Sequence, residues 1–428
     1  MDNLILYLIA LKLLMLFLGF PIAFSAIFIS MLYIFLEGIP LSIVAQKISF
    51  SMANFTLLAI PLFMLAGKIT TASGISDKIF DVALRAVGRV PGGLGHVNIA
   101  SSLIFSGMSG SALADVAGLG EIEYKAMTRK GYDPDFSVGV TLASSALGPI
   151  LPPSLPMVIF GVASGVSITG MFVGGILPAF FITAALMTYV FIIGKRKGYV
   201  DHSWDGWLAL ARAVFNALPA LLTPVLIVGG MLSGIFSATE AATAAVLWIL
   251  FASFVIYRRL SLKALYAVMY ESVIDTSRLL FLIACGLLLG WVLTDAHLPQ
   301  TITAWTSATF SSAWMFFLFV IVLLLVLGAI IENAILILVL APMLTPVALN
   351  QFGIEPVHFG VCVVFAIMLG QFTPPIGLSL FVMRGITGWR LGRVSMAVAP
   401  FLIPLIFSLL AMVLFPAITM TLPRAFGL

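Results

Sequence analysis

Long apolar stretches dominate the sequence, and short polar stretches separate them. About 20 apolar residues are enough for one helix to cross a bilayer. The pattern predicts spans over 4–36, 51–72, 136–165, 171–194, 213–236, 240–257, 279–296, 357–383 and 396–420. The first stretch lacks the basic start and cleavage site of a signal peptide, so we expect it to be retained as a span.

Two further apolar regions, 97–124 and 313–349, do not fit a simple span. The first is interrupted by the sequence Ser-Gly-Met-Ser-Gly-Ser at 106–111, and the second carries Glu332-Asn333 near its centre. Backbone that leaves the helix at membrane depth must be buried in protein or line a wet cavity. Both regions are therefore predicted to be re-entrant hairpins.

Charge spacing adds two amphipathic helices to this picture, over 75–90 and 261–278. Each has charged residues at helical spacing beside the end of a predicted span. A helix of this kind can lie along the membrane interface. Ordinary cytoplasmic loop helices are the alternative interpretation, and it applies more to the second stretch than to the first.

Composition supports a membrane protein. Of the 428 residues, 62% are hydrophobic and only 9% are charged, whereas soluble domains carry about 25% charged residues. A soluble enzyme and a nucleic-acid-binding protein are excluded on this basis. The two cysteines, Cys285 and Cys362, lie in apolar stretches, and their spacing suits neither a metal site nor a disulfide framework.

The basic residues predict which connections face the cytoplasm, because cytoplasmic loops are enriched in Lys and Arg. Clusters occur at 85–89, 125–130, 195–197, 258–263 and 384–393. The alternate connections, 165–170, 233–240, 295–312 and 350–358, contain no Lys or Arg and are predicted to face outward. Counting spans with this constraint places the N-terminus inside and the C-terminus outside. An extra turn or break within the first 36 residues is the alternative.

A shift of 222 residues aligns the two halves of the chain. It places Gly148-Pro149-Ile150-Leu151-Pro152-Pro153 over Gly370-Gln371-Phe372-Thr373-Pro374-Pro375, and it places the centres of the two hairpins over each other. In the predicted sidedness the paired spans have opposite orientations. The predicted fold is therefore an all-α polytopic membrane protein built as an inverted repeat, with two re-entrant hairpins and two Pro-broken helices.

The two Pro-Pro pairs indicate how such a fold can bind ions of both signs. A Pro-Pro within a span removes N–H donors and leaves carbonyl groups without helical partners. These carbonyls are hard ligands for a small cation. The half-helix that follows presents its N-terminal N–H groups, which can hold an anion at the same place.

Several polar side chains near the breaks are candidates for this chemistry. In the first half these are Ser106, Ser109, Ser111, Ser144, Ser145 and Ser154, and in the second half they are Asn333, Thr345 and Thr373. Bonding back to helix carbonyls is the alternative role for such groups.

Three acidic residues, Glu332, Asp115 and Glu240, have different predicted roles. A carboxylate at the bilayer centre costs about 2.5–3.5 kcal/mol on insertion scales, so Glu332 is expected to bind an ion or to carry a proton. A structural hydrogen bond is its alternative role. Asp115 is a similar but weaker candidate. Glu240 follows Ser237 by three residues, which is typical of a helix cap.

Five motifs together resemble one transporter family. They are IFSGMSGSA at 104–112, RKGYD at 129–133, LGPILPPS at 147–154, GIFSATEAA at 234–242 and GQFTPPIG at 370–377. They resemble the large membrane subunit of TRAP (tripartite ATP-independent periplasmic) transporters, the DctM-type permease, over essentially the whole chain. One difference is Glu332-Asn333, where the family commonly has Asp followed by a small residue or Pro.

The resemblance implies an elevator-type transporter that imports an organic anion with a sodium gradient. It implies sodium ions as the coupling ions and no other cofactor. The implied partners are a small four-span membrane subunit and a periplasmic substrate-binding protein, in a bacterial inner membrane. The implied sodium-binding residues are Ser106, Ser109, Gly110, Gly148, Glu332, Asn333, Gly370 and Thr373, and the implied substrate-binding residues are Ser111, Pro153, Ser154, Pro375 and Gly377.

On this basis the chain is expected to divide into alternating scaffold and transport segments. The expected segments are 1–72 scaffold spans, 73–93 an interfacial arm, 94–170 the first half of the transport domain, 171–260 scaffold spans, 261–312 a second arm with its span, 313–385 the second half of the transport domain, and 386–428 the terminal scaffold span.

Three other functions compete with sodium-coupled import. A proton-coupled carboxylate transporter would use Glu332 as the proton carrier. An anion channel fits the matched broken helices less well than alternating access does. A membrane-embedded enzyme would need a nucleophile with a base, or metal ligands at helical spacing, and the sequence shows neither.

Overall fold

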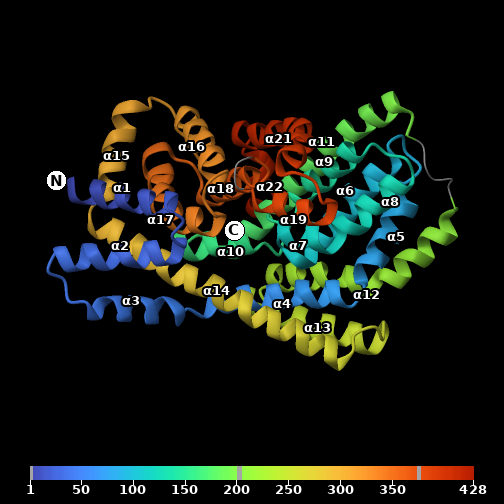
Figure 1. Cartoon of the computed structure of the whole chain (residues 1–428), viewed down its shortest axis with the longest axis horizontal. Helices are drawn as coiled ribbons and strands as arrows, with labels where there is room; N and C mark the ends of the chain where they lie inside the picture. Colours follow the sequence, from blue (N-terminus) through green and yellow to red (C-terminus); the bar gives the residue numbers. More distant parts are fainter. Residues whose placement is uncertain (1–2, 200–204, 374–376) are drawn as a thin grey trace.

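The computed structural model describes residues 3–199, 205–373 and 377–428, and all regular structure in these ranges is helical. This confirms the predicted all-α class. In Figure 1, α1, α2, α3 and α15 lie at one end of the long axis, and α5, α8 and α12 lie at the other.

The first half of the chain contains eleven α-helices within the described residues. They are α1 (Asn3–Phe17), α2 (Ile22–Leu36), α3 (Ser42–Met52), α4 (Ala59–Ala72), α5 (Ile75–Val87), α6 (Gly93–Ser109), α7 (Ala112–Asp115), α8 (Glu121–Arg129), α9 (Pro134–Ser145), α10 (Leu155–Ser164) and α11 (Ile168–Lys197). A π-helical turn over Val116–Gly120 joins α7 to α8.

The second half contains eleven more within the part of the chain that the structure describes. They are α12 (Trp207–Leu232), α13 (Ala238–Phe251), α14 (Leu262–Asp295), α15 (Leu298–Thr309), α16 (Ala313–Gly328), α17 (Asn333–Phe352), α18 (Pro356–Gly370), α19 (Leu378–Thr387), α20 (Leu391–Val398), α21 (Leu402–Leu414) and α22 (Ala417–Ala425).

Helix boundaries recur at the spacing that the sequence predicts. Adding 222 to the bounds of α5, α9 and α10 gives 297–309, 356–367 and 377–386. The helices observed there, α15, α18 and α19, occupy 298–309, 356–370 and 378–387. The two halves therefore share one order of helices, while their opposite orientation in a membrane stays a prediction.

Seven helices among the described residues are long and apolar enough to cross a membrane: Phe55–Ala72, Ile168–Lys197, Trp207–Leu232, Ala238–Ile256, Leu262–Asp295, Asn333–Phe352 and Leu391–Leu414. Four agree with predicted spans. Leu262–Asp295 starts 17 residues before its predicted span, Asn333–Phe352 falls in a region predicted to be a hairpin, and Leu391–Leu414 starts five residues early. Shorter apolar helices cover parts of other apolar stretches, among them Ile22–Leu36, Leu155–Ser164, Ala313–Gly328, Pro356–Gly370 and Leu378–Thr387.

The single span predicted over 4–36 is wrong. The chain forms two helices there, α1 and α2, which pack against each other. Gly19 has a φ of 85°, and Pro21 precedes the first residue of α2. A residue with positive φ followed by a proline cannot continue a helix. The predicted cytoplasmic position of the N-terminus depended on one crossing here, so that count no longer supports it.

Predicted stretches 261–278 and 279–296 form one continuous helix, α14, of 34 residues. At 1.5 Å per residue it is about 51 Å long. Between Ser261 and Ala296 no proline occurs, so nothing in the sequence ends the helix at the predicted junction. Stretch 75–90, by contrast, forms the separate helix α5, as predicted.

Spans 136–165 and 357–383 are each split into two helices, as predicted for Pro-broken segments. Non-helical backbone separates α9 from α10 over 146–154, and α18 ends at Gly370 while α19 begins at Leu378. Pro152 and Pro153 lie in the first break. Pro374 and Pro375 lie outside the described residues.

Both predicted hairpin regions fold back on themselves. α6 contacts α7 and α8 on the other side of Gly110, and α16 contacts α17 on the other side of 329–332. Their depth in a membrane, and with it their re-entrant character, stays a prediction.

Buried side chains form one large core and several smaller clusters. The large core joins residues of α6, α9, α10 and α11 with residues of α16 to α22. A separate cluster joins α1 and α2 to the last turns of α14, with Met343 of α17. The proposed division of the chain into scaffold and transport segments stays a prediction.

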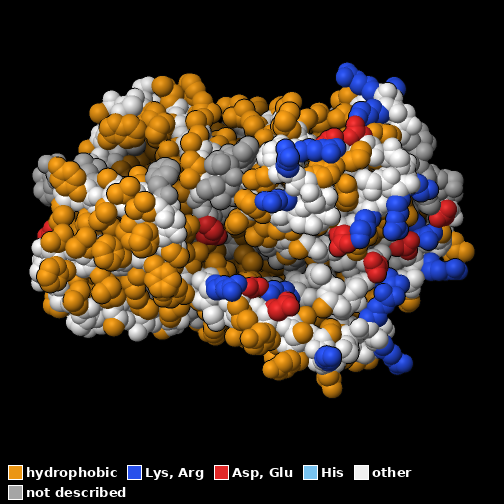
Figure 2. Space-filling view, in the orientation of Figure 1, with side chains coloured by type: hydrophobic (Ala, Val, Ile, Leu, Met, Phe, Trp, Pro, Cys, Tyr) orange, Lys and Arg blue, Asp and Glu red, His pale blue; other side chains and the backbone are white. Residues whose placement is uncertain are grey.

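Ion pairs link the connections that were predicted to be cytoplasmic. Arg85 pairs with Asp205 at 2.8 Å, Lys197 with Asp133 at 2.7 Å, and Arg393 with Asp135 at 3.0 Å. Figure 2 shows that charged side chains gather over one half of the visible face, while the other half is mainly hydrophobic. Which side of a membrane these connections face stays a prediction.

Candidate functional site

The turn of the first hairpin lies directly against the first helix break. The carbonyl oxygen of Gly110 accepts a hydrogen bond from the Leu155 N–H at 3.2 Å. A Cβ atom on Gly110 would lie 2.3 Å from the Pro153 carbonyl oxygen, and one on Gly148 would lie 2.8 Å from the carbonyl carbon of Ser111. Only glycine allows this approach of two main chains.

Serine side chains begin both helices that start at this contact. Ser111 Oγ accepts a hydrogen bond from the Ala114 N–H at 3.4 Å, and Ser154 Oγ accepts one from the Met157 N–H at 3.3 Å. Ser154 Oγ also donates to the Pro149 carbonyl at 2.5 Å. Serine is a favoured N-cap because its oxygen satisfies an N–H group that has no partner in the first turn. The sequence thus fixes where α7 and α10 begin.

The second half has a matching close contact. A Cβ atom on Gly370 would lie 2.4 Å from the carbonyl carbon of Gly328, and one on Gly328 would lie 2.8 Å from the Ile367 carbonyl oxygen. Asn333, the first residue of α17, is close to Met368, with Nδ2 to Sδ at 3.6 Å. The second hairpin is therefore packed on the end of α18, as the first is packed on the break between α9 and α10.

A cavity of about 240 Å³ lies between the two contacts. The first half contributes Ser111, Ala112, Leu113, Pro149, Leu155, Pro156 and Ile159, and the second half contributes Glu332, Asn333, Ala334, Ile337, Met368 and Gln371. Met64 of α4 and Leu279 of α14 complete the lining. The cavity is thus shared by the two halves of the repeat.

The charge of the lining is unusual for a pocket that would hold an anion. Among the described residues that line it, Glu332 is the only charged one, and no Lys, Arg or His is present. Glu332 Oε2 and Asn333 Oδ1 are buried and have no hydrogen-bond partner among the described residues. These two acceptors could be satisfied by a cation or by donor groups of a ligand.

Helix N-termini supply positive partial charge at the same cavity. α10 begins at Leu155 and α17 begins at Asn333, and both residues are in the lining. The first N–H groups of a helix have no partner within it and favour negative charge. The acidic pair can therefore hold a cation. At α10 the Leu155 and Met157 N–H groups already bond to the Gly110 carbonyl and to Ser154 Oγ, so this helix end favours an anion through its dipole and not through free donors.

Of the residues implied as sodium ligands, the structure brings Glu332 and Asn333 to the cavity and Gly110, Gly148 and Gly370 to the two contacts. Ser109 is buried, and its Oγ has no described partner. Ser106 Oγ donates to the Ser102 carbonyl at 2.6 Å, and Thr373 Oγ1 donates to the Gly370 carbonyl at 2.7 Å. Both of these hydroxyls thus bond back to the main chain.

Of the residues implied as substrate ligands, only Ser111 lines the cavity. The carbonyl of Pro153 faces Gly110. Gly377 packs on the main chain of Gln371, and a Cβ atom on Gly377 would lie 2.1 Å from the Gln371 carbonyl oxygen. Ser154 is fully buried, and its hydroxyl donates a hydrogen bond to the Pro149 carbonyl. Pro375 lies outside the described residues.

Sequence reasoning missed Gln371, Met368 and the aliphatic walls of the cavity. Gln371 sits between Gly370 and the second break, and its Oε1 accepts a hydrogen bond from Ser379 at 3.3 Å. Its position beside the motif could have identified it. Met64 and Leu279 lie in ordinary apolar stretches, and nothing in the sequence distinguishes them.

Glu240 is a helix cap, as predicted. Its carboxylate accepts a hydrogen bond from the Ser237 N–H at 2.8 Å, while Ser237 Oγ accepts one from the Glu240 N–H at 3.4 Å. The reciprocal pair forms a complete capping box.

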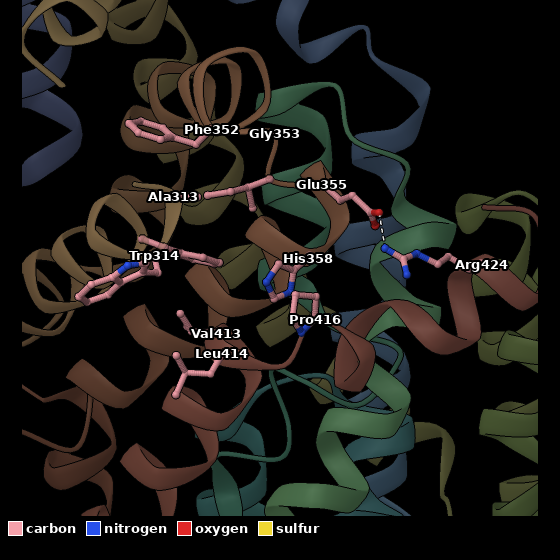
Figure 3. A pocket seen from close by; sticks show the side chains of 12 residues that line it. Ala313, Trp314, Phe352, Gly353, Glu355, His358, Val413, Leu414, Pro416 and Arg424 are labelled. Carbon is pink, nitrogen blue, oxygen red and sulfur yellow. Dashed lines mark hydrogen bonds and ion pairs between the residues drawn. The ribbon is translucent and has the colours of Figure 1, made fainter. Parts of the chain in front are cut away.

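A different pocket, of about 280 Å³, lies near the N-terminus of α18 (Figure 3). The ion pair of Glu355 and Arg424, 2.6 Å apart, lies on one side of it, and Trp314 lies on the other. His358 Nδ1 is 2.7 Å from Thr419 Oγ1. His358 is 12 residues from Gly370, which is about 18 Å along a helix. This pocket is therefore separate from the cavity at the breaks, and the one carboxylate among its described lining residues, Glu355, is paired through Oε1 with Arg424.

The fold and the site together define a polytopic membrane protein whose two halves share a cavity at the helix breaks. Residues 7–418 match the family described as Tripartite ATP-independent periplasmic transporter, DctM component. The chain belongs to this family, and the resemblance found in the sequence is confirmed. Accordingly it is a multi-pass inner-membrane protein and a transporter permease subunit, not an enzyme.

Curated relatives cover nearly all of the chain. It is 38% identical over 413 residues to the sialic acid TRAP transporter large permease protein SiaM of Vibrio cholerae, covering 96% of each chain. It is 36% identical to the C4-dicarboxylate TRAP transporter large permease protein DctM of Pseudomonas aeruginosa, covering 90% of each. It is 33% identical to the 2,3-diketo-L-gulonate TRAP transporter large permease protein YiaN of Escherichia coli, covering 93% of each.

A solved structure shares the fold. The YdaH transporter of Alcanivorax borkumensis matches with a TM-score of 0.64 at 14% identity, covering 87% of each chain. At this identity the likeness concerns the fold alone.

Proposed function

We propose that this chain is the permease subunit of a sodium-coupled transporter that imports a small organic anion, a carboxylate. The observation that carries the proposal is the cavity between the two hairpin turns, which holds one carboxylate, Glu332, and two helix N-termini. Membership of the TRAP family supports the transport of an organic acid, since the relatives are named for sialic acid, C4-dicarboxylate and 2,3-diketo-L-gulonate.

The charge of the cavity supports sodium coupling. An anion entering a site whose one ionisable lining residue is Glu332 meets a like charge unless a cation is present. The unpartnered Glu332 Oε2 and Asn333 Oδ1 are hard oxygen atoms of the kind that bind small alkali and alkaline-earth ions. A bound sodium ion would satisfy both atoms and would compensate the charge of the substrate.

An elevator-type motion and tripartite assembly are parts of the same proposal. In it, the two hairpins and the helices packed on them carry the cavity across the membrane. The family description is tripartite, and we infer that the other two components are a small membrane subunit and a periplasmic protein that delivers the substrate. A sialic acid TRAP permease from Haemophilus influenzae is longer than this chain, which covers 67% of it. The extra length leaves room for a fused small subunit.

Uptake into proteoliposomes tests the coupling. The chain is reconstituted with the small membrane subunit and supplied with a loaded binding protein, and an inward sodium gradient is expected to drive accumulation. A potassium gradient of the same size and membrane potential serves as the control. Equal accumulation in sodium-free medium with an inward proton gradient would instead establish the proton-coupled alternative, with Glu332 as the carrier.

A further inference from the structure

A second polar cluster lies inside the first hairpin, away from the cavity. It contains two carboxylates, Asp115 and Glu123, each only 1% exposed. Asp115 ends α7 and Glu123 lies in the first turn of α8, so the π-helical turn over Val116–Gly120 separates them. π-helical turns occur often at functional sites. Neither residue lines the cavity at the breaks.

Two adjacent serines of α6 hold the two carboxylates. Ser102 Oγ donates to Asp115 Oδ2 at 2.8 Å, and Ser101 Oγ is 2.6 Å from Glu123 Oε1. The cluster then extends to α9, because Ser102 Oγ is 3.1 Å from Ser144 Oγ, which in turn is 2.7 Å from Asn98 Oδ1. Four helices, α6, α7, α8 and α9, thus contribute oxygen atoms to one buried cluster.

The side chain of Asn98 is held in one orientation. Its Nδ2 donates to Thr141 Oγ1 at 2.7 Å, which turns its Oδ1 toward Ser144. Asn98, Ser102 and Ser144 are all fully buried. Water therefore has little access to these oxygen atoms.

The cluster has more acceptors than hydrogen atoms. A hydroxyl group supplies one hydrogen. If Ser102 donates to Asp115 and Ser144 donates to Asn98, no hydrogen remains for the 3.1 Å contact between the two hydroxyl oxygens.

The two carboxylates also lack hydrogen-bond donors. Asp115 Oδ1 and Glu123 Oε2 are buried and have no hydrogen-bond partner among the described residues. No Lys or Arg among the described residues forms an ion pair with either carboxylate. A buried carboxylate without a partner is costly, so either a bound cation or a proton must neutralise this cluster.

We propose that Asp115, Ser102, Ser144 and Asn98 form a sodium site inside the first hairpin, with Glu123 adding negative charge beside it. The inference rests on the proposed function, since sodium is taken there as the coupling ion. Asp115 Oδ1, the two serine hydroxyls and Asn98 Oδ1 are four oxygen ligands, and hard cations prefer oxygen. Mg²⁺ usually keeps several waters, which a site of 0–1% exposure has no room to supply.

Sodium binding to the purified full-length chain tests the site directly. Radioactive sodium is titrated onto the wild type and onto Asp115→Asn, and the number of ions bound at saturation is compared. Asp115→Asn is expected to bind one ion fewer, and potassium is expected not to compete at this site. An unchanged number and affinity would overturn the proposal.

A matched pair of serine variants guards against a folding defect. Ser144 and Ser145 are neighbours in α9, both fully buried, and each is 2.7–3.0 Å from a helix carbonyl. Only Ser144 contacts Ser102 and Asn98. Ser144→Ala is expected to weaken sodium binding at one site by about tenfold, in the range seen when a supporting ligand group is removed. Ser145→Ala is expected to leave it unchanged, and equal effects of both would overturn the site.

The outcomes separate this inference from the proposed function. Wild type that binds no sodium would refute both. Wild type whose sodium is lost in Glu332→Gln but fully kept in Asp115→Asn would refute only the site in the hairpin. If Asp115→Asn keeps its sodium but loses a proton that the wild type exchanges with solvent, the cluster holds a proton and the sodium assignment is wrong.

Discussion

Gly110 and Pro153 are in direct main-chain contact, so that a Cβ atom on residue 110 would lie 2.3 Å from the Pro153 carbonyl oxygen. The residues are 43 positions apart, and they join the turn of a hairpin to the break in another helix. This contact positions the N-terminus of α10 at the cavity. Substitutions at this glycine therefore test whether the contact is required for transport.

Gly110→Ala is expected to abolish uptake and to lower the melting temperature. Gly110 has a φ of 63°, which costs about 1–2 kcal/mol for a residue with a Cβ, and the clash with Pro153 adds to this. Gly165→Ala is the control, because Gly165 has a φ of 73° and nothing within 4 Å of its Cβ position. Gly165→Ala should lose only the stability that comes from the positive φ, because it has no clash. If both variants lose the same stability and keep uptake, the close contact has no functional weight.

Gly370→Ala tests the matching contact in the second half. A Cβ atom there would lie 2.4 Å from the carbonyl carbon of Gly328, so the end of α18 and the end of α16 must separate. We expect loss of uptake and reduced thermal stability. Gly385, in α19, has open space around its Cβ position, and Gly385→Ala should raise stability by about 1 kcal/mol because alanine favours helix. Thermal unfolding of the purified chain would show whether the two changes have opposite signs.

Glu332→Gln is expected to raise the sodium concentration that gives half-maximal uptake by about tenfold, which corresponds to about 1.4 kcal/mol of binding energy. The change removes the one charge of the described cavity lining while keeping the size of the side chain. Glu240→Gln is the matched control, since its carboxylate only caps α13 at the surface. Sodium titrations of uptake that coincide for wild type and Glu332→Gln would exclude Glu332 from the ion site.

The ion pair of Asp133 and Lys197 should contribute stability that depends on pH. The hydrogen bond from Lys197 lowers the pKa of Asp133 below its ordinary value of 3.8. A lowered pKa means that the stabilising contribution is present at neutral pH and is lost as the pH falls through the pKa of the folded state. A double-mutant cycle of Asp133→Asn and Lys197→Gln should give about 0–1 kcal/mol at pH 7, typical of a surface pair.

The same cycle, repeated at falling pH, checks the assignment. The coupling energy between the two residues should shrink below pH 3.8 and should be unchanged between pH 6 and pH 8. A coupling energy that is constant down to pH 3 would show that the pair is not the source of the lowered pKa.

Sequence reasoning located the two breaks and the hairpin turns because each has a specific local signal. Two prolines in a span, as at Pro152-Pro153, are incompatible with an unbroken helix, and small residues around Gly110 are incompatible with a simple apolar span. The 222-residue shift then predicted the bounds of α18 and α19 from those of α9 and α10 to within a few residues.

Where the chain is uniformly apolar, the sequence had no such signal. The break at 18–21 is hidden in a stretch of apolar residues, and only Gly19 and Pro21 mark it. The cavity walls formed by Met64 and Leu279 depend on how distant helices pack, and hydropathy does not encode this. Ser154 was assigned to substrate on its motif alone, whereas a local hydrogen bond to Pro149 uses its hydroxyl.

The length of α14 makes the two halves of the repeat differ in structure at the matching position. Its 34 residues form one continuous helix that contacts α2, α3, α4 and α17. Lys68 of α4 forms an ion pair with Asp275 of this helix, 2.5 Å apart. The corresponding part of the first half is divided into two α-helices, because α3 ends at Met52 and α4 begins at Ala59. The two halves of the repeat therefore differ at this position, because one continuous helix in the second half corresponds to two separate helices in the first.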